Sequence, residues 1–180
     1  MKIVFIFKVQ NQSLYSVKEN DSNFDEFDKV FDLWQDVEYL ENFFYKNEAD
    51  LSSFYSISVE DAVRQTLHDA KEFQKRILGI KDSNGLGGGM LSSYFRPLDK
   101  IFKRGIYEKC KAYGTIDVGW LRLYAVKIPE NCYVITGGAI KLTKKMNERE
   151  HTQEQLQKLI NCIDYLRSVG IVDDEGIIDI

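Results

Sequence analysis

The sequence predicts an α+β fold in which a twisted, mostly antiparallel sheet with a central hairpin packs against several helices. Three observations lead to this prediction. Runs rich in β-branched and aromatic residues stand at the N-terminus and at 120–143. Two long segments, 25–46 and 58–78, repeat apolar residues every three or four positions, as helices with one buried face do. A third segment of this kind follows at 152–168.

Length and composition predict a single globular domain over 1–180. Strands, two helices and a glycine-rich connector are expected in 1–95, and the hairpin with its helix in 96–180. A hydrophobic share of 44% and an aromatic share of 13% exclude a disordered chain. No apolar run approaches the roughly 18 residues that a membrane span needs, and the first residues lack the pattern of a signal peptide. We therefore expect a cytoplasmic protein that does not bind a membrane.

The cysteines and histidines give no sign of a metal or cofactor site. Cys110, Cys132 and Cys162 are widely spaced and form no CxxC pair, which indicates buried free thiols in a reducing compartment. Two histidines without clustered ligands do not fit a structural zinc site. We expect no metal and no cofactor.

The first half of the chain is expected to form a hairpin followed by two helices. Residues 2–7 and 12–18 are the predicted hairpin strands. Helix 25–46 comes next, and helix 58–78 begins at Ser58, which precedes Asp61 by three residues as a cap should. The polar, glycine-rich stretch 79–95 is predicted to be a mobile connector. Its G-L-G-G-G run is not followed by Lys-Ser or Lys-Thr, so the stretch does not match the motif of a phosphate-binding loop.

The second half begins with a predicted short helix from Pro97 to about Lys109. Two strands, WLRLYAVKI and NCYVITGGAIKLT, then form a hairpin around Pro129. Gly137 and Gly138 indicate a bulge or a close approach of another backbone. Helix 152–168 is expected to start at Thr152 with a T-x-x-Q capping box and to end at Gly170. Its residues expected to be buried are Leu156, Leu159, Ile160 and Ile163.

Side-chain alternation assigns the first strand of this hairpin two different faces. Leu121, Leu123 and Ala125 share an apolar face that should pack on helices. The opposite face carries a cation and two aromatic rings, and is therefore a candidate working surface. Its members are Trp120, Arg122, Tyr124 and Val126.

Charge is distributed unevenly along the chain. Residues 81–151 hold 13 Lys and Arg against 7 Asp and Glu, a net charge of +6. Residues 1–80 hold 9 against 15, which gives −6, and residues 152–180 hold 2 against 6, which gives −4. A basic middle between acidic flanks indicates an anionic partner for that segment, or an ordinary solvated surface.

The hairpin and the helix after it resemble a known family. A strand with Arg122-x-Tyr124, a tight turn, a strand ending in Ile140-Lys141, a basic Lys144-Lys145 pair and a helix from Thr152 follow one another. This order resembles the C-terminal core of RelE-superfamily toxins, especially the HigB or phage Gp49-like branch. The block GGAIKLTKKMNEREHT is also similar to one in uncharacterised Bacteroidetes proteins of this length.

The resemblance implies the toxin of a type II toxin–antitoxin system, a metal-free mRNA endonuclease that acts on the ribosome. An antitoxin protein, encoded by an adjacent gene, would hold it inactive. In such chemistry the 2′-hydroxyl attacks the neighbouring phosphate, a base takes its proton, and cations stabilise the developing charge. The candidate catalytic residues are Arg122, Tyr124, Lys141 and His151. The candidate RNA-binding residues are Lys144, Lys145, Arg149 and Trp120.

Each candidate also has a structural interpretation. Arg122 would pair with a helix carboxylate, Lys144 and Lys145 would be solvated, His151 would be a surface residue, and the aromatic rings would be packing residues. The acidic tail IVDDEGIIDI would extend the sheet, fold over the basic face or be an inert terminus. A non-catalytic, toxin-like protein-binding module is the competing functional hypothesis, and a small-molecule site between the aromatic helices and the sheet is a third.

Overall fold

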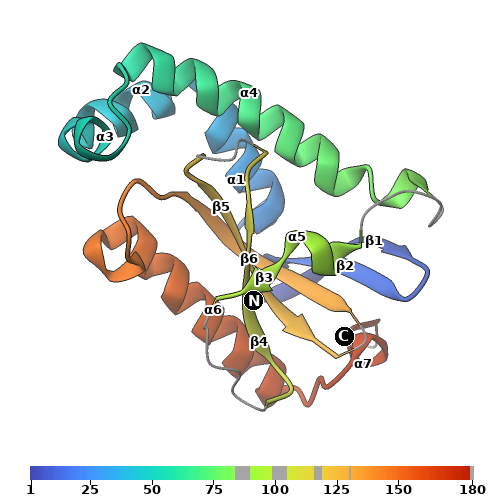
Figure 1. The fold of residues 1–180 in the computed structure, drawn as a ribbon. Coiled ribbons are helices and arrows are strands. Elements are labelled where there is room, and N and C mark those ends of the chain that lie inside the picture. The colour runs from blue at the N-terminus through green and yellow to red at the C-terminus, as the bar shows by residue number, and fades with distance from the viewer. Residues whose placement is uncertain (84–89, 99–104, 116–118, 130, 179–180) are drawn as a thin grey trace.

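A six-stranded mixed sheet lies at the centre of the structure (Figure 1). The structure is a computed structural model that describes residues 1–83, 90–98, 105–115, 119–129 and 131–178. The strands are β1 (Lys2–Val9), β2 (Gln12–Lys18), β3 (Arg96–Pro97), β4 (Glu108–Tyr113), β5 (Leu121–Ile128) and β6 (Cys132–Ile140). They are ordered β1-β2-β6-β5-β4-β3.

Both predicted hairpins are confirmed. β1 pairs with β2, and β5 pairs with β6, each in antiparallel fashion. The β5–β6 hairpin occupies the middle of the sheet, as expected from its β-branched and aromatic residues. The pairing of β2 with β6 is parallel, and it joins the N-terminal hairpin to the second half of the chain.

The helices cover both faces of the sheet (Figure 1). They are α1 (Glu26–Gln35), α2 (Val37–Lys46), α3 (Glu48–Phe54), α4 (Val59–Leu78), α5 (Leu91–Tyr94), α6 (Glu150–Ser168) and α7 (Asp174–Ile178), with single 3₁₀ turns at Lys81–Ser83 and Met146–Glu148. α1 and α4 cover one face, and α6 covers the other. None of the helices among the described residues is long and apolar enough to cross a membrane.

The prediction of one helix over 25–46 was wrong. The chain leaves the helical conformation at Asp36, where φ is −88° and ψ is 112°. The Asp36 carboxylate accepts a hydrogen bond from the Tyr39 N–H and so caps α2. The apolar period continues through the break, which is why the sequence pattern does not reveal it. The predicted cap of α4 is confirmed, since Ser58 Oγ accepts a hydrogen bond from the Asp61 N–H.

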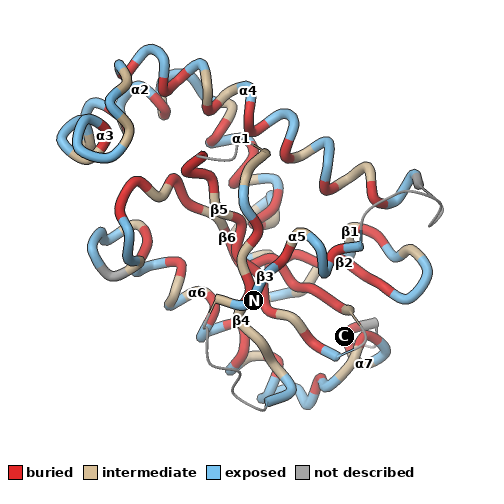
Figure 2. Tube along the Cα trace, in the orientation of Figure 1, coloured by how far each residue is buried: buried red, intermediate tan, exposed pale blue. Residues whose placement is uncertain are grey.

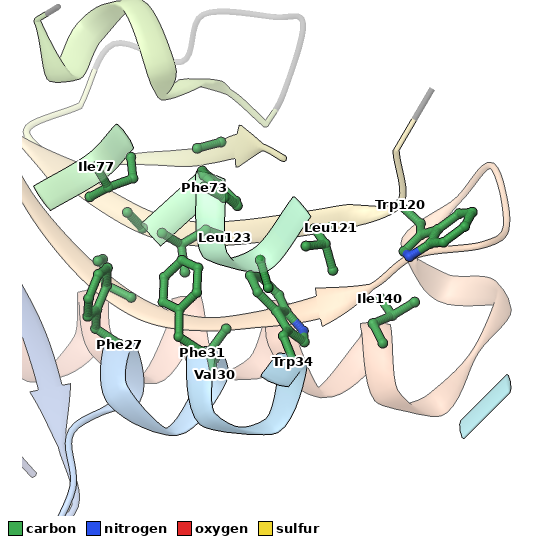
Figure 3. Packing of buried hydrophobic residues seen from close by; sticks show 14 of the residues in the cluster. Phe27, Val30, Phe31, Trp34, Phe73, Ile77, Trp120, Leu121, Leu123 and Ile140 are labelled. Carbon is green, nitrogen blue, oxygen red and sulfur yellow. The ribbon is translucent and has the colours of Figure 1, made fainter. Parts of the chain in front are cut away.

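The larger apolar cluster lies between the sheet and α1, α2 and α4 (Figure 3). Leu121 and Leu123 of β5 meet Phe31 and Trp34 of α1 there, and the Trp34 ring stacks on Phe73 of α4 at 6.2 Å between ring centres. The prediction that this face of β5 packs on helices is confirmed. β5 and β6 are buried along most of their length (Figure 2).

The smaller cluster lies on the opposite face, under α6. Leu159, Cys162 and Leu166 of α6 are fully buried there with Tyr124 and Val126 of β5. Of the four α6 residues predicted to be buried, Leu159 and Ile163 are, whereas Leu156 is half-buried and Ile160 is 38% exposed. Leu166, which belongs to the same predicted apolar stripe, is also buried, and the helix is rotated so that Cys162 faces the sheet in place of Ile160.

The two ends of α6 differ in how well they were predicted. α6 begins at Glu150, and Thr152 donates its hydroxyl to the carbonyls of Arg149 and Met146, so the expected T-x-x-Q capping box does not form. At the other end Gly170 has φ +73°, a left-handed conformation that favours glycine, and it ends the helix as predicted.

The prediction of a helix over 97–109 was also wrong. Pro97 lies in the edge strand β3 and Lys109 in β4; residues 99–104 lie outside the described part. β4 forms because Cys110 and Ala112 alternate with polar residues and are buried against the larger cluster. An edge strand tolerates Pro97, which has no N–H to donate. The connector prediction for 79–95 falls partly on 84–89, also outside the described residues, while the adjoining residues form a 3₁₀ turn and α5.

The predicted bulge is confirmed at Gly137, and Gly138 lies at a close contact with side chains of α1. Tyr124 pairs with Gly137 and Ala125 with Ile135, so one extra residue bulges out of β6. A Cβ atom on Gly138 would lie 2.7 Å from Val30 Cγ1 and 2.8 Å from the Trp34 ring. The glycine therefore allows α1 to approach the sheet closely.

The acidic tail is anchored to the N-terminal hairpin. The Asp174 carboxylate, 5% exposed, accepts hydrogen bonds from Lys8 Nζ at 2.5 Å, Ser13 Oγ at 2.6 Å and Tyr15 Oη at 2.8 Å. Burial by itself would raise the pKa of Asp174, but these three donors outweigh it and hold that pKa below its ordinary value. The tail is thus not inert, and its described residues neither add a strand to the sheet nor line the basic pocket defined below.

We expect Asp174→Ala to lower the free energy of unfolding by about 1–3 kcal/mol at pH 7, because three donors lose a buried charged acceptor. A lowered carboxyl pKa contributes stability above the unfolded value near 3.9 and loses it as the pH falls. The difference between wild type and variant, measured by urea unfolding, should therefore shrink from pH 6 to pH 3. A constant difference over that range would contradict the assignment.

Candidate functional site

An open pocket of about 430 Å³, which we call the basic pocket, lies where the first half of β5 meets the loop after β6. The cations that line it are Lys111, Arg122, Lys141 and Lys144. The aromatic residues that line it are Phe54, Tyr55, Tyr113 and Tyr124. No Asp or Glu belongs to the lining that the structure describes. The pocket therefore combines four cations with aromatic walls.

Strand register brings these side chains together. Arg122 and Tyr124 are two positions apart on β5 and so share one face of the sheet. In the neighbouring strand β4, Tyr113 pairs with Arg122 and Lys111 pairs with Tyr124. Lys141 follows β6 directly, and its N–H donates to the Trp120 carbonyl at 2.8 Å, which holds the start of the loop beside β5.

The Arg122 side chain is held by backbone carbonyl groups of the residues just before it. Its Nη1 donates to the carbonyls of Gly119 at 2.9 Å and Leu121 at 2.8 Å, and its guanidinium carbon lies 4.2 Å from the centre of the Tyr113 ring. No carboxylate pairs with Arg122 among the described residues, so the expected alternative of a helix partner is not what the structure shows. Burial lowers the pKa of Arg122, yet a guanidinium stays charged at neutral pH. A fixed cation without a counterion is suited to bind an anion.

Lys141 is held by two carbonyl groups. Its Nζ donates to Thr143 O at 2.5 Å and to Lys144 O at 2.6 Å. Burial, and then the charges of Arg122 and Lys111, lower the pKa of Lys141 below its ordinary value. In its deprotonated form the Lys141 amine has two N–H bonds for these two carbonyls and a lone pair that can accept a proton.

Tyr124 lines the pocket, and its hydroxyl group is buried without a partner in the described part of the chain. The residue is fully buried, and its hydroxyl has no hydrogen-bond partner among the described residues. Burial raises the pKa of Tyr124, so the phenol is neutral at pH 7. Buried hydroxyl groups are normally satisfied, so this one is an unused donor next to the pocket.

The structure brings together four of the eight predicted site residues. Arg122, Tyr124, Lys141 and Lys144 all line the basic pocket, as expected if they form one neighbourhood. Their chemical roles stay a prediction. Lys145 is exposed to solvent and lies outside the lining of the pocket.

The other three residues have structural contacts instead. Trp120 is 2% exposed and donates its indole N–H to Thr66 Oγ1 at 2.8 Å. It precedes β5 by one residue and packs on the helical side of the sheet, so it cannot stack on a base and we withdraw that assignment. Arg149 forms a two-pronged ion pair with Asp50 of α3 at 2.7 and 2.5 Å. His151 Nε2 lies 3.0 Å from the Ile140 carbonyl, and its ring meets Phe43 edge-on, outside the lining of the pocket.

Sequence reasoning missed Lys111, Tyr113 and the two aromatic residues at the end of α3, Phe54 and Tyr55. The signal for the first pair was present, because Lys109, Lys111 and Tyr113 alternate with Cys110 and Ala112 as in a half-buried strand. The assignment of this region to a helix hid it. Phe54 and Tyr55 carry no comparable signal, since only the packing of α3 brings them to the pocket.

Comparison of the chain with family models, with curated proteins and with solved structures finds no match in any of the three. The site is therefore interpreted from its own residues. Within the described part of the chain, no group of three or more His, Cys, Asp or Glu side chains is placed to hold a metal ion.

Proposed function

We propose that the protein is a toxin of RelE or HigB type, an endoribonuclease that cleaves mRNA by attack of the 2′-hydroxyl without using a metal ion. The observation that carries the proposal is the basic pocket, whose described lining holds four cations, no carboxylate, and Tyr124, the hydroxyl of which is buried without a described partner. Four of the residues that make up the resemblance to these toxins, Arg122, Tyr124, Lys141 and Lys144, line this pocket.

The cations would bind the scissile phosphate. Arg122 offers its remaining N–H groups to the phosphate oxygens, and it is already oriented by Gly119, Leu121 and Tyr113. Lys111 and Lys144 add positive charge at the same place. Because these groups need not reorganise when charge develops on the phosphate, they lower the barrier to attack.

Lys141 and Tyr124 would transfer the protons. The 2′-hydroxyl gives its proton to neutral Lys141 Nζ while its oxygen forms a bond to phosphorus. The bond from phosphorus to the 5′-oxygen breaks, and that oxygen takes a proton from Tyr124. Proton exchange with solvent restores both residues. The products are a 2′,3′-cyclic phosphate and a 5′-hydroxyl end.

The proposed partners follow from the same resemblance. The substrate would be mRNA on the ribosome, in the cytoplasm, and an antitoxin protein encoded by an adjacent gene would block the pocket. A net charge of −4 weakens binding to free nucleic acid. A ribosome that positions the message would compensate for this weak affinity.

We expect the purified protein to cleave RNA slowly in the presence of EDTA, with a rate that rises with pH because Lys141 must be neutral. The measurement is the rate of cleavage between pH 6 and pH 9, with and without ribosomes, together with the chemistry of the product ends.

An RNA with a single 2′-deoxy nucleotide at the cleaved position is the control, and it should stay intact at that position. Binding of RNA without any cleavage, with or without ribosomes, would favour the non-catalytic module. Cleavage that EDTA abolishes would refute the proposed chemistry.

A further inference from the structure

A second pocket of about 330 Å³ adjoins the basic pocket. The residues that line it include Arg76 near the end of α4, Tyr94 of α5, Arg96 of β3, and Tyr113 with Thr115 at the end of β4. Neither arginine has an ion-pair partner among the described residues, and the described lining holds no Asp or Glu. We call it the arginine pocket.

The two pockets share one side chain. Tyr113 lines both pockets, and the residue is 39% exposed. On the side of the basic pocket, the Arg122 guanidinium lies 4.2 Å and Lys111 Nζ 5.6 Å from the ring centre. Tyr113 is therefore a partly exposed aromatic ridge with cations on both sides.

The sheet sets the spacing of the cations across this ridge. Arg96 of β3 pairs with Lys111 of β4, and cross-strand neighbours have Cβ atoms about 4.5–5.5 Å apart. Tyr113 pairs in turn with Arg122 of β5. Positive charge thus extends over three adjacent strands, from Arg122 through Lys111 to Arg96. A single phosphate needs only one of the two pockets, whereas a chain of phosphates can use both.

We infer that the ligand is a single strand of nucleic acid that runs from the basic pocket over Tyr113 into the arginine pocket, with successive phosphates in the two pockets. A base would stack on Tyr113, which requires it to be unpaired. This inference rests on the proposed function for the phosphate site itself. It adds the path of the strand over the surface, a second phosphate subsite at Arg76 and Arg96, and a preference for a polymer over a dinucleotide.

The test uses 2′-deoxy oligonucleotides, which the proposed chemistry cannot cleave, so that binding is measured apart from catalysis. The wild-type protein should bind a single-stranded deoxyhexanucleotide more tightly than a deoxydinucleotide, which has one phosphate. Arg76→Ala with Arg96→Ala should weaken binding of the hexanucleotide about tenfold and leave the dinucleotide unchanged. The slope of log affinity against log salt should fall in magnitude by about 0.7, since the variant loses one phosphate contact and each such contact in a single strand contributes about 0.7.

Lys71→Ala with Lys75→Ala is the matched control, because it removes the same charge from exposed positions of α4 outside both pockets. Its effect on the hexanucleotide should be small. An equal loss in both double variants, or no loss in the arginine variant, would overturn the inference. If Arg122→Ala left the affinity for the dinucleotide unchanged, the proposed phosphate site itself would be refuted. The two failures are therefore distinguishable.

Discussion

Replacing Arg122 with alanine is expected to lower the rate of RNA cleavage by about 100- to 1000-fold, the usual effect of removing one preorganised donor to a developing negative charge. Lys141→Ala should have an effect of similar size because it removes the proposed base. The double variant should relieve growth inhibition when the protein is expressed without a neighbouring antitoxin. Cleavage rates and growth curves measure the two effects.

Arg64→Ala is the control, since Arg64 lies on the exposed side of α4 and forms an ion pair with Asp61 of the same helix. It should cleave and inhibit like the wild type. Thermal unfolding must show that each pocket variant is folded. Growth inhibition that persists undiminished in the folded double variant would refute the assigned site.

Trp120→Ala is expected to lower the free energy of unfolding by about 3–5 kcal/mol, the cost of deleting a large buried aromatic ring. Trp120 is 2% exposed, its ring meets Tyr55 at 5.0 Å and Phe44 at 5.5 Å between ring centres, and its indole is hydrogen-bonded to Thr66. Denaturant unfolding measures the loss.

The Trp120→Phe variant distinguishes a role of Trp120 in core packing from a role in binding RNA. It keeps most of the ring volume and loses the hydrogen bond to Thr66, so stability should fall less than in the alanine variant. Its affinity for oligonucleotides should equal that of the wild type. A stable phenylalanine variant with a clear loss of affinity would restore Trp120 as a stacking platform and contradict its place in the core.

The elements that the sequence predicts well depend on local patterns. β1, β2, β5 and β6 alternate or run apolar between turn residues, and α4 combines a helical period with the Ser58 cap. These patterns report which face of each element is buried. For the same reason the juxtaposition of Arg122 with Tyr124 on one face, and of Lys141 at the end of the next strand, could be predicted from the hairpin alone.

The elements that sequence reasoning missed depend on distant partners. β4 has few apolar residues, and it becomes a strand because it pairs with β5 and buries Cys110 and Ala112. Lys111 and Tyr113 therefore reach the site only through that pairing. Trp120 and Arg149 were misassigned because their partners, Thr66 and Asp50, lie 54 and 99 residues away in the chain.

The sequence by itself determined the α+β class, the central hairpin and the face of β5 that carries Arg122 and Tyr124, because side-chain alternation and helical period act within a few residues. Only the tertiary structure decided that this face is divided between the core under α6 and a pocket. It also decided that the pocket excludes His151 and Trp120 and includes Lys111 and Tyr113. The physical reason is that the packing of α1 to α4, the register of β4 and the rotation of α6 depend on contacts between segments that are distant along the chain.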